Sequence, residues 1–189
     1  MNVLGSALFL MLALSRKWAL NTSSHLEETK QRVSEQKNYL QGIFNSAREL
    51  IFVKDWDGNF QIANEALADF YDTTPEKLLG QNEADINPNV DEVEGFLEDD
   101  REVMRSEESK TFQEQPVTHL RTGETHWFHT TKVPLFTDKP LKQRQILVVA
   151  TDITERKQMQ EDLEASLQEK EQTNKILHPT NGSNRSIKS

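Results

Sequence analysis

The chain has no cysteine among its 189 residues. This absence excludes disulfides, thiolate metal sites, cysteine nucleophiles and iron–sulfur clusters. The sequence also has no glycine-rich phosphate-binding loop, no Ser–His–Asp set in a plausible context, and no room for an ATPase domain. We therefore predict no catalytic residues and a protein that is not an enzyme.

Long hydrophobic runs are scarce as well. Val3–Leu14 carries no charge, but it is shorter than the roughly 20 apolar residues of a bilayer-spanning helix. Arg16 and Lys17 follow the run, whereas a signal peptide has its positive charge first. Such flanking charge favours the cytoplasmic side. We interpret residues 1–20 as a short hydrophobic leader or truncated membrane anchor, the alternatives being an amphipathic leader and a mis-assigned start. The expected location is the cytoplasm, with or without tethering to the inner face of the plasma membrane.

Basic residues are few between Asn82 and Glu108. Eleven acidic side chains, Glu83 and Asp100 among them, face only Arg101 and Arg105 in this stretch. Such a surface repels phosphate backbones, so we expect no nucleic-acid partner. We interpret the acidic stretch as a solvated helical face.

A weak heptad pattern lies between the apolar run at Val3–Leu14 and the segment that begins near Leu50. The apolar residues that recur at the seven-residue spacing are Ala19, Leu26, Val33, Leu40 and Ala47. The spacing predicts a linker helix over residues 21–37 and a coiled-coil seam. Because most companion positions are polar, an ordinary amphipathic helix packed on the domain is the alternative.

Turn and capping signals divide the following segment into short elements. Asp57-Gly58 predicts a β-hairpin, and Asn64 predicts the start of a helix. Thr74 with Pro75 predicts a second short helix. A longer helix is expected from Leu97 to Ser106, since Pro88 and Gly95 interrupt the chain before it. Strands are expected over 112–120, 125–135 and 146–150, with a charged helix from 154 to about 171. This order indicates an α+β domain with a mostly antiparallel sheet.

Several segments in this order resemble the PAS family with its PAC-type C-terminal motif, of the kind found in bacterial sensor histidine kinases. They are LIFVKDWDGNFQIANEA, TPEKLLGQNEADINP, FLEDDREVMRSEES, HWFHTTKVPL and VVATDITERK. The resemblance implies a PAS domain over residues 38–154, with a five-stranded antiparallel sheet of order 2-1-5-4-3, short helices on one face and signalling helices on both flanks. It makes Asp152, Ile153 and Thr154 the exit motif leading to an output helix over 155–175. The last residues, HPTNGSNRSIKS, are polar, and we predict a disordered tail over residues 176–189.

The resemblance also suggests which cofactors to consider. The covalent flavin adduct of some PAS photosensors needs a cysteine and is excluded. Haem sensors of the family use a histidine on the long helix, and residues 97–106 contain none, which disfavours haem. The cofactor is otherwise unknown, and a non-covalent flavin or a small metabolite stays open.

Strand alternation and the family fold together suggest a ligand pocket. Alternation over residues 125–133 separates Trp127 and His129 from His126 and Phe128, and we take the first pair to face inward. Since His126 and His129 then point apart, we expect no metal site. The predicted pocket residues are Ile51, Val53, Phe70, Met104, Trp127, His129 and Val148, each of which would also suit a plain hydrophobic core.

The stretch LEASLQEKE followed by KILH resembles the linker and phosphoacceptor start of a histidine-kinase family. His178 occupies the position of the phosphorylated histidine, but Pro179 would break the helix that presents it. We interpret this end as a truncated or remodelled kinase segment, with a working phosphoacceptor as the alternative.

Taken together, these features predict a sensory or interaction module without an output domain of its own. It would sense a small ligand or a partner and relay the signal through its flanking helices to a histidine kinase or another output domain in trans. The alternatives are a histidine-kinase fragment that uses His178 and a ligand-free dimerisation adaptor. We expect a parallel homodimer held by the flanking helices, where Met159, Leu163 and Leu167 continue the apolar pattern, and membrane contact through the N-terminus is a further alternative.

Overall fold

The computed structural model describes residues 3–177 and divides the chain into two compact units, Met1–Ala47 and Arg48–Ser189. His178 and most of the expected tail lie outside the described residues.

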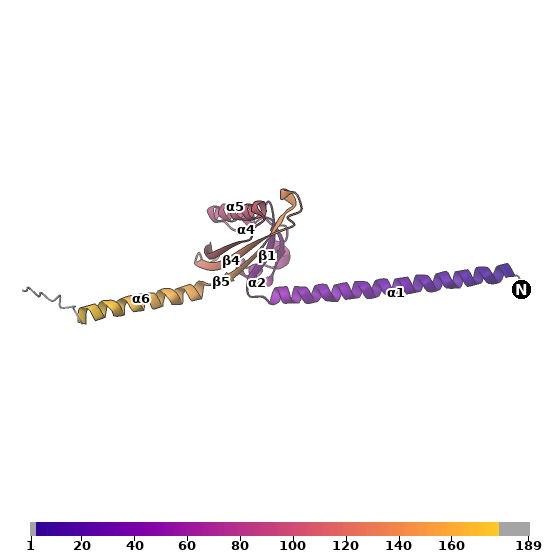
Figure 1. Cartoon of the computed structure of the whole chain (residues 1–189), viewed down its shortest axis with the longest axis horizontal. Helices are drawn as coiled ribbons and strands as arrows, with labels where there is room; N and C mark the ends of the chain where they lie inside the picture. The colour runs from indigo at the N-terminus through magenta and orange to yellow at the C-terminus, as the bar shows by residue number, and fades with distance from the viewer. Residues whose placement is uncertain (1–2, 178–189) are drawn as a thin grey trace, which may run out of the picture. The chain divides into compact units, whose positions relative to one another are not determined.

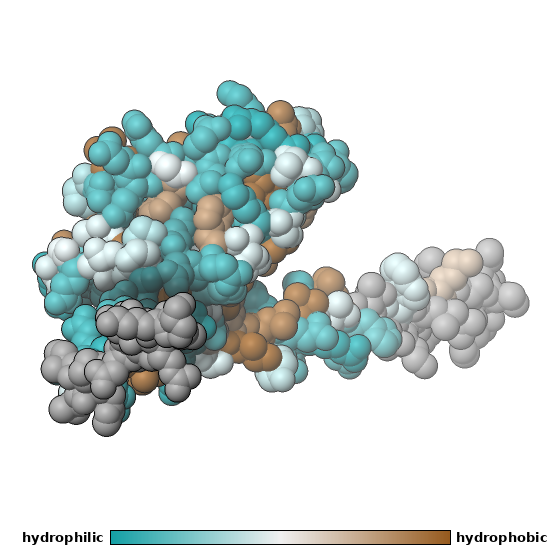
Figure 2. Space-filling model, turned by 60° about the vertical axis from the view of Figure 1, so that its left-hand side comes forward, coloured by the Kyte–Doolittle hydropathy of each residue, from teal (hydrophilic) through white to brown (hydrophobic). Residues whose placement is uncertain are grey.

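The first unit is a single long helix, α1 (Val3–Ser46). It includes the predicted linker helix over 21–37 and continues past it. Leu26, Val33 and Leu40, three of the residues at the heptad spacing, are exposed on its surface. Figure 2 shows apolar surface along the described part of this helix. Among the residues that the structure describes, no helix has the length and apolar character needed to cross a membrane.

The second unit is built on a five-stranded antiparallel sheet (Figure 1). Its strands are β1 (Leu50–Asp55), β2 (Phe60–Ala63), β3 (Lys110–Thr118), β4 (Thr125–Leu135) and β5 (Gln145–Asp152). Their spatial order is β2-β1-β5-β4-β3. The predicted α+β class and the strand order that the resemblance implied are both confirmed.

The hairpin between β1 and β2 forms where the sequence predicts it. Gly58 has a φ of +91°, a conformation that costs glycine little because it has no side chain to clash. The carboxylate of Asp55 accepts hydrogen bonds from the backbone N–H groups of Asp57 and Asn59. These bonds satisfy turn donors that would otherwise depend on water.

Four helices follow the hairpin, namely α2 (Glu65–Phe70), α3 (Pro75–Leu78), α4 (Glu83–Ile86) and α5 (Val90–Ser106). Asn64 caps α2 as predicted, because its side chain accepts from the Leu67 N–H. The start predicted for the long helix is wrong: α5 begins at Val90 and includes Gly95. A helix tolerates one interior glycine at a cost of about 1 kcal/mol, and the Asn89 side chain caps this one at its N-terminus.

The hydrophobic core lies between one face of the sheet and these helices. Phe52 and Val148 from the sheet pack with Leu67, Leu78 and Met104 from α2, α3 and α5. The short 3₁₀ helix η1 (Leu141–Gln143) lies in the loop before β5. After β5 the chain continues into α6 (Thr154–Leu177), several residues longer than predicted.

Candidate functional site

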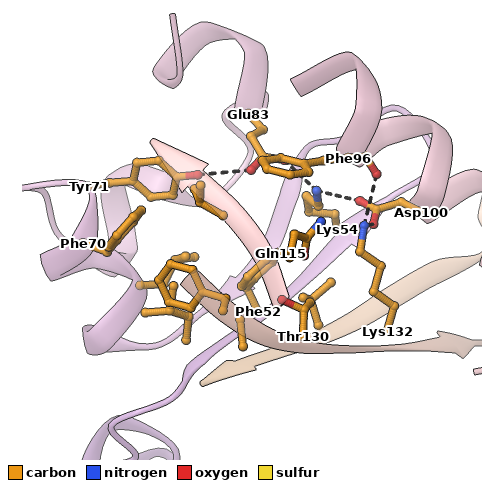
Figure 3. Close-up of a pocket in the computed structure, with 16 residues that line it drawn as sticks. Phe52, Lys54, Phe70, Tyr71, Glu83, Phe96, Asp100, Gln115, Thr130 and Lys132 are labelled. Carbon is orange, nitrogen blue, oxygen red and sulfur yellow. Dashed lines mark hydrogen bonds and ion pairs between the residues drawn. The ribbon is translucent and has the colours of Figure 1, made fainter. Parts of the chain in front are cut away.

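A cavity of about 50 Å³ lies on the helix-covered face of the sheet (Figure 3). Strands β1, β3, β4 and β5 and helices α2, α4 and α5 all contribute side chains to its lining. Pockets for drug-sized ligands are typically about 300–1,000 Å³. The cavity in this conformation is therefore suited only to a very small molecule or to a few waters.

One part of the cavity wall is apolar and largely aromatic. The ring of Phe70 meets Phe128 and Tyr71 edge to face, with centroids 5.5 and 5.6 Å apart. Phe52 and Val148 complete the wall from β1 and β5. Edge-to-face packing favours defined ring geometries, so the position of the Phe70 ring is coupled to the positions of the rings around it.

The other part of the wall is a buried charge network, by which we mean Lys54, Glu83, Asp100 and Lys132 with the hydroxyl of Tyr71. The Nζ of Lys54 lies 2.6 Å from Oε2 of Glu83 and 2.6 Å from Oδ2 of Asp100. The Nζ of Lys132 lies 2.7 Å from Oδ1 of Asp100. The Tyr71 hydroxyl donates to Oε1 of Glu83 at 3.1 Å. Figure 3 shows these side chains converging from β1, α4, α5 and β4.

The four charged side chains of the network are almost completely shielded from solvent. Their residues are only 1–6% exposed, at 2% for Lys54, 6% for Glu83, 1% for Asp100 and 3% for Lys132. Burial of an unpaired charge is very costly, and here two cations are matched by two anions. The network is therefore neutral as a whole, and each member depends on its partners.

The same contacts shift the protonation equilibria. Burial opposes the charged form of Asp100, but the ammonium groups of Lys54 and Lys132 outweigh it and lower the pKa of this carboxyl. Burial likewise opposes the charge on Lys54, and Asp100 and Glu83 overcome it, so the pKa of Lys54 is raised. Burial and the Glu83 carboxylate both raise the pKa of the Tyr71 phenol. These shifts keep Asp100 and Lys54 ionised and Tyr71 protonated at neutral pH.

The predicted pocket residues are only partly brought together by the structure. Phe70 and Val148 line the cavity, whereas Met104 is fully buried in the core beside it. Ile51 and Val53 alternate with Phe52 and Lys54 along β1, so they lie on the opposite face of the sheet.

Strand β4 has the opposite orientation to the one we expected. Phe128, Thr130 and Lys132 line the cavity, and Trp127 and His129 alternate with them. Trp127 instead lies near α6, where the Lys157 ammonium is 4.4 Å from its ring centroid. The expectation was wrong because both faces of β4 carry aromatic residues, and alternation alone does not tell which face a helix covers.

The acidic stretch also needs a correction. Most of it is solvent-facing, as expected, but Glu83 and Asp100 are buried in the network. Helical spacing would have indicated Asp100, since Phe96, Val103 and Met104 fall on the same face of α5. Strand alternation would likewise have indicated that Lys54 and Lys132 are buried, because Lys54 shares a strand face with Phe52 and Lys132 shares one with Phe128.

The predicted exit motif lies at the junction of β5 and α6. Oδ1 of Asp152 accepts from the Thr154 N–H at 2.8 Å, and the Thr154 hydroxyl oxygen accepts from the Trp127 N–H at 2.9 Å. Ile153 is buried and donates its N–H to the Trp127 carbonyl at 2.7 Å. The start of α6 is thus attached to β4 by two hydrogen bonds, one to the N–H and one to the carbonyl of Trp127.

A continuous set of contacts connects this junction with the cavity. The ring of Phe70, which lines the cavity, lies edge-on to His126 and His119 at 5.8 and 5.1 Å. His126 Nδ1 is 2.9 Å from Oδ2 of Asp152. Partial burial opposes ionisation of Asp152, yet its hydrogen bonds with Thr154 and His126 lower the pKa of this carboxyl. Phe70 therefore contacts both the cavity and the residue that holds the exit carboxylate.

Metal ligands are not clustered in this part of the molecule. Across the described residues 3–177, no group of three or more histidine, aspartate or glutamate side chains is arranged to hold a metal ion.

Comparison with known proteins decides the family. Residues 44–158 match the PAS fold family over more than half of the chain. The chain belongs to the PAS family.

The chain is 26% identical over 134 residues to the methanogenesis regulatory histidine kinase FilI of Methanothrix harundinacea. This match covers 71% of the chain but only 15% of the relative. The chain thus corresponds to a small part of that kinase.

Solved structures share the fold of the second unit. A Vibrio cholerae VqmA dimer solved without target DNA matches with a TM-score of 0.53 at 19% identity, over 61% of this chain and 50% of that one. VqmA in a complex with ligand and DNA matches with a TM-score of 0.51 at 20% identity, over 59% and 49% of the two chains. These likenesses concern the fold, and the PAS fold is generally a sensory rather than an enzymatic module.

Proposed function

We propose that this PAS domain is a sensory module in which a change at the cavity is relayed to α6 through Phe70, His126 and Asp152. The observation that carries the proposal is the set of contacts from the cavity wall to the start of α6. An occupant that moved the Phe70 ring would act on His126 at 5.8 Å, and through it on the carboxylate that bonds the first turn of α6.

The energetics of the site suit a switch. A ligand shifts an equilibrium between two conformations only by its difference in affinity for them. The buried charge network tolerates few arrangements, because separating one partner leaves an uncompensated charge in the interior. A small occupant beside it would therefore favour one packing of α2 and β4 over another.

The output would be a protein in trans or a further part of a longer chain. Similarity to a regulatory histidine kinase supports a kinase as the receiver of the signal. Helix α6 would transmit it, since Met159, Leu163 and Leu167 form an exposed apolar stripe along its length.

Hydrogen–deuterium exchange at the exit junction tests the relay. Phe70→Leu keeps an apolar side chain but loses the ring edge against His126, and His126→Phe keeps a ring but loses the bond to Asp152. Both substitutions should speed exchange of the Ile153 and Lys157 amides, which are bonded to the Trp127 and Ile153 carbonyls.

Phe96→Leu is the matched control. Phe96 also lines the cavity, but it lies over the Lys132 ammonium rather than beside His126. The Phe96→Leu variant should exchange the Ile153 and Lys157 amides at nearly the wild-type rate. Equal acceleration by all three variants would show that the junction responds to general loosening, and the relay would be rejected.

A further inference from the structure

We infer that the cavity selects a small uncharged molecule, with one hydrogen-bonding oxygen and a short apolar part, over carboxylates and amines of the same size. This inference rests on the proposed sensory function, because it names the ligand class that would occupy the same cavity.

Charge balance is the first reason. Two ammonium groups and two carboxylates meet in the network, and each carboxylate oxygen already has a partner. Those of Asp100 contact Lys54 and Lys132, and those of Glu83 contact Lys54 and Tyr71. A ligand with its own charge would enter a buried site with no counter-charge left for it, and its desolvation would not be repaid.

The network nevertheless has hydrogen-bonding capacity for a neutral group. An ammonium has three N–H donors. Within the described contacts, Lys54 uses two of them on Glu83 and Asp100. Lys132 uses two on Asp100 and the Phe96 carbonyl. The Tyr71 hydroxyl donates to Glu83, which leaves its oxygen as an acceptor. A carbonyl or hydroxyl oxygen can pair with these groups without changing the charge.

The rest of the wall determines size and apolar character. The rings of Phe52, Phe70 and Phe128 line the cavity together with the network. A cavity needs a volume of about 10–15 Å³ to hold one water molecule. A cavity of about 50 Å³ therefore holds roughly four water-sized groups, which corresponds to a ligand of about four or five non-hydrogen atoms.

The test uses four probes of near-equal size on the full chain: 2-butanone, propionamide, propionate and butylammonium. Binding is followed by methyl-resolved NMR at Leu67, Val148 and Ala150, all of which line the cavity. Ligands this small bind weakly, so titrations extend to tens of millimolar. We expect butanone and propionamide to shift these methyl signals at concentrations at least about tenfold lower than the two charged probes.

Charge-altering variants sharpen the test. Lys54→Met leaves the carboxylates in excess and should turn the preference toward butylammonium. Asp100→Asn leaves the lysines in excess and should turn it toward propionate. Glu83→Gln should act in the same direction as Asp100→Asn and replaces it if that variant does not fold. Thr130→Val changes the lining without changing the charge, and it should keep the preference for the neutral probes.

The outcomes separate this inference from the proposed function. If propionate or butylammonium binds wild-type protein as tightly as butanone, the inference is wrong while the cavity remains a ligand site. If the charge variants keep the wild-type order of preference, charge balance does not select the ligand. If none of the four probes shifts a cavity methyl, both the inference and ligand sensing through this cavity are rejected, while the relay itself is still judged by the exchange experiment.

Discussion

Asp100 is the central residue of the buried charge network, because its two carboxylate oxygens contact two different lysines. Buried ion pairs contribute little net stability compared with a well-packed apolar substitute, but breaking one on a single side is costly. The consequences of this arrangement can be measured at single residues.

Replacement of Asp100 should strongly destabilise the domain. Asp100→Asn keeps the shape of the side chain and removes the charge that balances Lys54 and Lys132. We expect a loss of about 3–5 kcal/mol in the free energy of unfolding, measured by urea denaturation. Asp99→Asn is the control, because Asp99 is partly exposed and pairs with the surface residue Lys110. Its loss should stay below about 1 kcal/mol, and equal losses would contradict the central role of Asp100.

The pKa shifts predict how stability depends on pH. The pKa of Asp100 is lower in the folded state than its ordinary value of 3.8. The contribution of ionised Asp100 to the free energy of unfolding is therefore complete above pH 3.8. It is lost as the pH falls through the lowered pKa of the folded state. The pKa of Lys54 is raised from 10.5, so its contribution is complete below pH 10.5 and is lost at higher pH. Unfolding curves across pH should show both losses in the wild type. In Asp100→Asn the free energy of unfolding should fall less steeply with pH in the acid range. An unchanged dependence would mean that other carboxylates control acid unfolding.

At the scale of the elements, the orientation of two strands and the length of one helix determine the site. Lys54 on β1 and Lys132 on β4 point toward α5, and Asp100 on α5 points toward these two strands. The helix forms this face over its full length only because it passes through Gly95 without a break.

Glycine substitutions in two elements should have opposite effects. A Cβ at Gly95 meets no atom within 4 Å, so Gly95→Ala should stabilise α5 by about 0.5–1 kcal/mol. A Cβ at Gly58 lies 3.3 Å from Leu97 at a φ of +91°, so Gly58→Ala should destabilise the hairpin by roughly 1–2 kcal/mol. Thermal melts followed by circular dichroism measure both changes. A lower melting temperature for Gly95→Ala would mean that α5 is distorted at this residue.

At the scale of the whole molecule, the proposed sensor needs a partner for its exposed apolar stripes. On α1, Leu26, Val33 and Leu40 repeat every seven residues and are exposed. We propose that a second copy of the chain covers this stripe in a parallel dimer, because a two-fold partner presents the same stripe in return. Polar companion positions such as Thr29 and Gln36 should keep the association weak, with dissociation in the micromolar range.

Sedimentation of the chain from Ser23 onward tests the dimer. Val33→Glu and Leu40→Glu bring like charges together across a parallel seam, and each should weaken self-association at least about tenfold. Gln31→Glu adds the same charge on the side of α1 away from the stripe and should leave association nearly unchanged. A monomer at every accessible concentration would rule out the proposal, and so would a dimer indifferent to both seam substitutions.

Local sequence signals predict the order and type of most elements of this PAS domain. The hairpin at Asp57-Gly58 and the cap at Asn64 are local features, since each depends on the conformational preference or hydrogen bonding of a few adjacent residues. The absence of cysteine excluded whole classes of chemistry for the same reason, because composition needs no fold. The strand order came from family resemblance rather than from these local preferences.

Packing between segments distant in the sequence determines which strand faces turn inward and which charges are buried. In β1, Ile51 and Val53 are as apolar as Leu50 and Phe52, so alternation defines two faces without choosing between them. Lys54, Lys132 and Asp100 resemble surface residues in isolation. They are stable in the interior because strands and a helix distant in the sequence bring both ammonium groups within 2.7 Å of the Asp100 carboxylate. Such pairing is a property of the assembled fold alone.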